Sequence, residues 1–135
     1  MHSSWITTIV VATSFLLFAT GCTQSDWGTL DGVVQLNGAA VGPGTIMLKP
    51  IDGDRAGAMA MFGADGVYSV MSAGRKAGAP AGEYQVTIHG EDALGEGANP
   101  QAKSSIPSRY ADAGISGLTV RIEPGENTQD FQLEP

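Results

Sequence analysis

The sequence contains little cysteine and little histidine. Its 135 residues include one cysteine, Cys22, and two histidines, of which only His89 follows Cys22. One cysteine cannot form a disulfide within the chain, so a domain after Cys22 must be held together by burial alone. Any His-dependent catalytic triad must use His89, and neither a Gly-x-Ser-x-Gly elbow nor a His-Glu-x-x-His motif is present. The sequence also has no run of the roughly 20 apolar residues that a membrane-spanning helix needs.

What the N-terminal part does contain is a shorter uncharged apolar run, residues 5–19, followed by Thr20, Gly21 and Cys22. The run has the length of a signal-peptide core. Together with the small residues and the cysteine it resembles a bacterial lipoprotein signal. We therefore expect residues 1–21 to be removed, Cys22 to carry diacylglycerol as a thioether, and residues 22–28 to form a short lipidated tether. A simple secretion signal and a retained anchor are the alternatives.

The charged residues all lie after Cys22, and the net charge is −7. An acidic domain repels polyanions, so nucleic acid is not an expected partner. The expected partner is the membrane itself, through the acyl chains on Cys22. We expect an exported protein anchored to the cell membrane or the outer membrane, facing the periplasm or the surface. Thr23 is not the aspartate of an inner-membrane retention signal, which favours the outer membrane.

Period-two alternation of apolar residues between turn signals predicts strands throughout the rest of the chain. Asn37-Gly38 is a strong hairpin signal, and Asp65-Gly66 marks another turn. No segment has helical periodicity. We predict an all-β fold, a single antiparallel β-sandwich of about seven strands spanning residues 29–135. The expected strands cover residues 30–36, 45–49, 58–62, 67–71, 83–89, 118–122 and a closing segment around residues 131–133, preceded by a turn at residues 124–127.

The inward positions of these strands predict the core. They are Val34, Leu36, Ile46, Leu48, Tyr68, Val70, Tyr84, Val86, Ile88, Val120, Ile122, Phe131 and Leu133. Tyr84 follows Gly82 at the start of its strand, a position typical of a tyrosine corner, in which the hydroxyl bonds to an upstream backbone group.

Four segments of this region together resemble the carboxypeptidase regulatory-like domains. They are residues 32–38 (GVVQLNG), 65–70 (DGVYSV), 80–88 (PAGEYQVTI) and 124–127 (PGEN). The resemblance implies a transthyretin-like or Ig-like sandwich of a kind common in bacterial lipoproteins. Residues 106–110 (IPSRY), with residues 116–120 behind them, resemble the version found in small uncharacterised lipoproteins.

Three groups of residues after Cys22 are candidates for a site. Asp52, Asp54 and the acidic residues 91–96 supply oxygen ligands suited to Ca²⁺, or are solvated turn carboxylates. Met59-x-Met61 places two thioethers on one strand face, which suits Cu(I), although methionine is also a common core filler. The third group lies in the long connection of residues 91–117.

That connection is longer than most loops of compact domains, and such loops tend to be functional or disordered. We single out Ile106, Arg109 and Tyr110 in it as a possible binding loop. Ile106 and Tyr110 also have the character of packing anchors that pin the connection to the sandwich.

These observations favour a non-enzymatic, lipid-anchored binding or assembly module of the cell envelope, with no cofactor. An envelope protein or a carbohydrate is the expected ligand class. Two alternatives stay open. One is a small transthyretin-like hydrolase that uses His89, and the other is a Ca²⁺-stabilised adhesion-type module.

Overall fold

The structure is a computed structural model, and the residues that it describes are 26–91 and 105–135. The fold of these residues is all-β, as predicted, and the helical element whose two ends are both described is a short 3-10 turn, η2 (Ser108–Ala111). The strands are β1 (Trp27–Leu36), β2 (Ala39–Ala40), β3 (Gly44–Pro50), β4 (Ala58–Phe62), β5 (Val67–Ser69), β6 (Met71–Ser72), β7 (Ala79–Pro80), β8 (Gly82–Gly90), β9 (Leu118–Ile122), β10 (Gly125–Thr128) and β11 (Phe131–Leu133). The predicted signal peptide, Cys22 and most of the acidic segment 91–96 lie outside the described residues.

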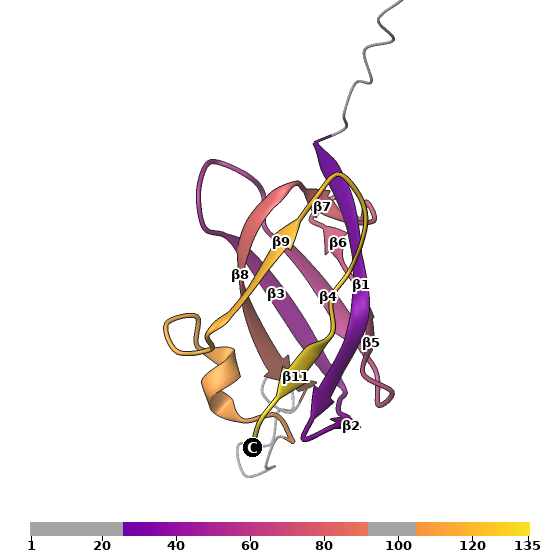
Figure 1. Ribbon diagram of the computed structural model, residues 1–135, viewed down its shortest axis with the longest axis vertical. Helices are drawn as coiled ribbons and strands as arrows, with labels where there is room; N and C mark the ends of the chain where they lie inside the picture. The colour runs from indigo at the N-terminus through magenta and orange to yellow at the C-terminus, as the bar shows by residue number, and fades with distance from the viewer. Residues whose placement is uncertain (1–25, 92–104) are drawn as a thin grey trace, which may run out of the picture.

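The strands form one curled sheet with the order β10-β1-β5-β4-β3-β8-β9, to which β2, β6, β7 and β11 are added at the sides. Figure 1 shows β9 and β11 in front of β3 and β4, with β1 along one side. The two ends of the sheet meet, because Gly28 on β1 lies directly against Ile122 and Glu123 at the end of β9. The segment from β9 to β11 therefore pairs first with β8 and then with β1.

The centre of the sheet is regular and antiparallel. β3 pairs with β4 on one side and with β8 on the other, and β8 pairs with β9. In β8 the side chains of Tyr84, Val86 and Ile88 are fully buried, while those between them are partly exposed. The alternation in the sequence predicted these strands almost to the residue.

The first strand differs from the prediction in its start and in its partners. β1 begins at Trp27, two residues before the expected domain boundary, and pairs with β2, β5, β7, β10 and β11. Its hairpin with β2 confirms the Asn-Gly signal, since Asn37 and Gly38 have φ values of 52° and 81°.

The expectation of purely antiparallel pairing is wrong for the two strands nearest the C-terminus. β10 and β11 both run parallel to β1. The expected turn at residues 124–127 is also wrong, because β10 begins at Gly125. The sequence Gly-Glu-Asn-Thr has turn chemistry and no apolar alternation, yet it pairs with β1 through its backbone.

Polar contacts attach residues 123–130 to β1 and to its neighbour β5. We call this contact the closing seam, residues 123–130 against residues 28–33 and Tyr68. The Tyr68 hydroxyl on β5 donates to the Gln129 carbonyl, and the Asn127 side-chain amide donates to the Thr29 carbonyl at 3.0 Å. The Val33 amide donates to Asp130 Oδ1 at 3.0 Å. A side chain at Gly32 would overlap the Gln129 carbonyl, so the absence of a Cβ permits the close approach.

The predicted core is confirmed at every position except Leu36, which is only partly buried and packs against the edge of the cluster. Tyr68 and Phe131 stack with ring centroids 5.7 Å apart. Core residues that the alternation did not single out are Leu30, Val41, Ala58, Ala60, Phe62, Ala79, Ile106 and Tyr110.

Tyr84 forms the expected corner. Its ring is fully buried and its hydroxyl donates to the Pro80 carbonyl at 2.6 Å, four residues upstream. This bond fastens the start of β8 to the preceding strand β7.

Candidate functional site

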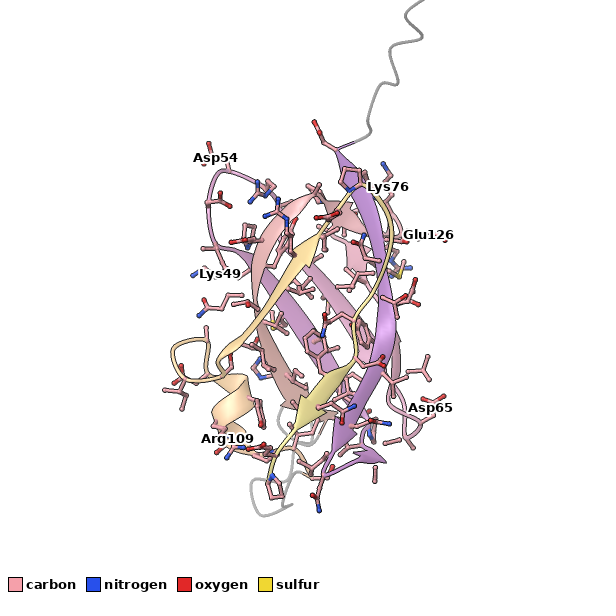
Figure 2. The ribbon with its side chains drawn as sticks, in the orientation of Figure 1. Lys49, Asp54, Asp65, Lys76, Arg109 and Glu126 are labelled. Atoms are coloured by element: carbon pink, nitrogen blue, oxygen red, sulfur yellow. The ribbon has the colours of Figure 1, made fainter. Side chains whose placement is uncertain are left out.

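The structure places the predicted binding-loop residues at the end of the protein that holds the C-terminus. Ile106 and Tyr110 are buried, as expected of packing anchors. Arg109 lies beside the C-terminal residues (Figure 2), and its guanidinium donates to the carbonyls of Glu134 and Pro135 at 2.6 and 3.2 Å.

Tyr110 completes this arrangement. Its hydroxyl accepts from the Glu134 amide and from the Arg109 guanidinium, each at 2.9 Å, and that guanidinium lies 4.8 Å from the ring centre. We call these residues, Arg109, Tyr110, Glu134 and Pro135, the C-terminal clamp. Their donors and acceptors serve contacts within the protein.

His89 lies on the partly exposed face of β8, where its Nε2 is 3.2 Å from the Thr87 hydroxyl. Within residues 26–91 and 105–135, no carboxylate bonds to its ring. The structure thus brings no orienting acid to the histidine there, as a catalytic triad would need.

The candidate calcium ligands are not brought together in the described part of the chain. Asp52 pairs with Arg55, three residues away, and Asp54 is exposed at the tip of the same loop, seen in Figure 2. Across residues 26–91 and 105–135 no three His, Cys, Asp or Glu side chains converge as a metal site would require.

The outer face of β3, β4 and β6 carries a different set of side chains. In β4 the residues Ala58, Ala60 and Phe62 point into the core, so Met59 and Met61 point outwards. Met47 on β3 and Met71 on β6 are exposed as well. The exposed fractions of Met47, Met59, Met61 and Met71 are 48%, 47%, 76% and 41%. We call these four residues the methionine face.

The register of the strands aligns three of the four exposed methionines across the sheet. Met47 on β3 is the direct cross-strand partner of Met59 on β4, and Met59 is the direct partner of Met71 on β6. Such partners have Cβ atoms about 4.5–5.5 Å apart. Met61 lies two residues further along β4 and is paired with Thr45 instead. Met47, Met59 and Met71 are the methionine row.

Two open hollows lie on either side of Met59. One, of about 500 Å³, extends over β3 and β8 and is bordered by Met47, Lys49, Gln85 and Thr87. The other, of about 700 Å³, extends over β5 and β6 and is bordered by Met61, Val67, Met71 and Arg75. Met59 and Ala73 border both, so the two hollows form one continuous and largely apolar surface.

Among the residues that the structure describes, the charges bordering this surface are the cations of Lys49 and Arg75, and no described carboxylate borders either hollow. The two perturbed hydroxyls of the protein belong to the core. Burial raises the pKa of Tyr68 well above its ordinary value, and the nearby Asp130 and Asp31 raise it further. Burial also raises the pKa of Tyr84, with Arg55 acting in the opposite direction. Neither hydroxyl is a base near neutral pH.

Part of the methionine face was visible in the sequence. The spacing Met59-x-Met61 predicted two thioethers on one strand face, and the structure shows that this face is the exposed one. Met47 lies between the inward Ile46 and Leu48, which was a further signal for an outward side chain. What the sequence did not show is that Met47, Met59 and Met71 share one cross-strand line, because register is set by the pairing of β3, β4 and β6.

In the described residues there is no helix with the length and apolar character needed to cross a membrane. The chain matches no protein-family model, no curated protein sequence and no solved structure. The candidate site is therefore defined by its own geometry, an exposed row of thioethers on a regular sheet.

Proposed function

We propose that this protein is a lipid-anchored, non-enzymatic binding or assembly module of the cell envelope, and that the methionine face is its binding surface. The observation that carries the binding role is the set of four large apolar side chains held exposed on regular strands beside two hollows. Surface patches of this kind commonly mark interaction sites.

The anchoring half of the proposal rests on the lipoprotein-like segment that ends at Cys22. Trp27, the first residue of β1, is five positions after Cys22, and this stretch of chain spans at most about 18 Å. The end of the domain where β1 begins would therefore face the membrane. Figure 1 shows the C-terminus at the opposite end of the molecule, beside η2.

The side chains at this end suit a position near lipid headgroups. Trp27 Nε1 donates to the Ala77 carbonyl at 2.8 Å, and the Lys76 ammonium lies 3.9 Å from the centre of the indole ring. Tryptophan and lysine both combine an apolar body with a polar tip, which favours the boundary between lipid and water.

The family we propose is that of the carboxypeptidase regulatory-like domains, with their transthyretin-like or Ig-like sandwich. Support comes from the four sequence segments described above, from the curled all-β sheet and from the Tyr84 corner. A non-enzymatic role is favoured over a His89 hydrolase because, within the described residues, Thr87 is the polar side chain bonded to the His89 ring.

Cys22→Ser tests the anchor. The wild-type protein, expressed in a bacterium that processes lipoproteins, should enter the detergent phase and have an intact mass that starts at Cys22 with acyl chains added. Cys22→Ser should lose the acyl mass and remain an uncleaved precursor, since only the thiol can accept the lipid. Thr23→Ser, a change of similar size at the next residue, should behave as wild type. A wild-type mass that starts elsewhere, or that lacks acyl chains, would refute the anchor.

A further inference from the structure

The distribution of methionine in this protein is unusual. Methionine commonly fills irregular gaps in cores, yet the described core cluster contains none. The chain has five methionines, Met1 and the four of the methionine face. Every methionine after Met1 thus lies on one exposed surface, while the adjacent inward positions of β4 hold alanine and phenylalanine. Packing does not account for this arrangement.

The geometry of the methionine row allows its three sulfur atoms to converge on a single bound ion. Neighbouring strands lie about 4.8 Å apart, so the backbones of Met47 and Met71 are roughly 10 Å apart with Met59 midway between them. Each side chain has three rotatable bonds. The outer two thioethers can therefore lean towards Met59 from opposite sides, and all three sulfur atoms can meet above the sheet.

Thioether sulfur is a soft, neutral ligand that selects Cu(I) over hard or borderline cations. We propose that Met47, Met59 and Met71 bind one Cu(I) ion, or Ag(I) as its chemical analogue, through their three sulfur atoms. The ion would sit on the surface between the two hollows. The net charge of −7 favours the approach of a cation, although Lys49 and Arg75 stand at the rims.

This inference names a ligand for the binding surface and so rests on the binding half of the proposed function. It requires no change of oxidation state and no bond rearrangement, because the ion arrives as Cu(I) and each sulfur donates a lone pair. Met61 serves as an internal comparison. It is the most exposed of the four, but it pairs with Thr45 and lies outside the row.

The first test is a competition titration without oxygen, using the full chain in detergent micelles and a chromogenic Cu(I) chelator. The wild type should take one Cu(I) per chain. Met59→Leu removes the central ligand, so affinity should fall by at least the roughly tenfold to hundredfold that loss of an outer-sphere partner costs. Met61→Leu should change affinity by less than about twofold, and the triple variant Met47→Leu/Met59→Leu/Met71→Leu should not compete with the chelator. Leucine keeps the volume of methionine, so all variants should fold.

The second test locates the ion directly. With Ag(I) and methionine labelled at its methyl carbon, the resonances of Met47, Met59 and Met71 should shift together and saturate at one equivalent, while that of Met61 should shift least. The proposal is overturned if the wild type fails to compete with the chelator, if the triple variant binds as tightly as the wild type, or if no methyl resonance of the row shifts.

These outcomes separate the ion site from the proposed function. An acylated protein that binds no Cu(I), but whose methionine face cross-links to an envelope protein, would refute the ion site and keep the binding module. A protein that binds Cu(I) through the row but lacks acyl chains would refute the anchor alone.

Discussion

The closing seam and the methionine face lie on the same sheet, but their side chains differ in bonding and exposure. At the seam, Tyr68, Asn127 and Asp130 each bond to a backbone group that is distant in the sequence. On the methionine face the side chains are exposed, and none of the four has a partner among the described hydrogen bonds or ring contacts. The seam therefore holds the fold closed, whereas the face is available to a ligand. Substitutions should divide accordingly, with large effects on stability at the seam and small ones on the face.

Phe131→Ala should have the largest effect. The ring is buried on β11 and stacks on Tyr68 at the inner side of the seam. Its removal leaves a cavity, which for a large aromatic costs about 3–5 kcal/mol of unfolding free energy. Urea denaturation measures the change. The exposed neighbour Gln132→Ala is the matched control and should stay within about 0.5 kcal/mol of wild type. Equal effects of the two would mean that β11 is not packed as described.

Tyr68→Phe keeps the ring and removes only the hydroxyl. The Gln129 carbonyl then loses its donor in a part-buried position, which should destabilise the protein by about 1–3 kcal/mol. The same denaturation measurement applies. An unchanged midpoint would show that the hydroxyl contributes nothing to the seam.

The pH dependence of stability sharpens this result. Tyr68 ionises near pH 10 in an unfolded chain, whereas burial raises its pKa in the folded protein. Folding therefore keeps this hydroxyl protonated. Its contribution to the free energy of unfolding is fully present below pH 10 and falls as the pH rises above 10, by up to about 1.4 kcal/mol per pH unit. The stability gap between wild type and Tyr68→Phe should therefore narrow above pH 10. A gap that stays constant up to pH 11.5 would contradict the burial of the hydroxyl.

Tyr84→Phe should have a smaller effect, on the order of 1 kcal/mol. It removes the bond to the Pro80 carbonyl, a local contact four residues apart, and leaves the long β3–β8 pairing intact. Thermal unfolding monitored by circular dichroism is the measurement. An unchanged thermal midpoint would show that the Tyr84–Pro80 hydrogen bond does not stabilise the fold.

Met59→Leu should have the smallest effect on stability, within about 0.5 kcal/mol of wild type, because the side chain is half exposed and its replacement has similar volume. Ala60→Leu, at the buried neighbour on the same strand, should by contrast destabilise the protein by about 1–3 kcal/mol through overpacking. If Met59→Leu were the more damaging of the two, the methionine face would belong to the structure rather than to binding.

The same contrast explains how much the sequence could predict. Strand β8 and its buried Tyr84, Val86 and Ile88 followed from alternation, because one face of a half-buried strand leaves a period of two in the chain itself. The hairpin at Asn37-Gly38 followed from the backbone freedom of two residues. Both are local properties.

The seam and the candidate site depend on partners that are far away in the sequence. Nothing in Gly125-Glu126-Asn127-Thr128 indicates that β1 lies beside it in parallel, since that segment pairs through its backbone and has little apolar character. Likewise the spacing of Met59 and Met61 put them on one strand face, but their exposure and the alignment of Met59 with Met47 and Met71 required the register of three strands. Arg109 and Tyr110 had the residue types of a binding loop, and only the structure shows that the C-terminal carbonyls occupy them.

The pairing of β1 with the C-terminal strands also determines when the fold can form during synthesis. Gln35 and Gln132 bond across the β1–β11 pair although they are 97 positions apart in the chain. At about 5–20 residues per second, synthesis delivers the second of them about 5–20 seconds after the first. Throughout that interval the backbone of β1 lacks its parallel partner β11, and such long-range pairing is slow to form even once the chain is complete. A nascent chain of this protein thus cannot complete the β1 side of its sheet until its last residues have been made.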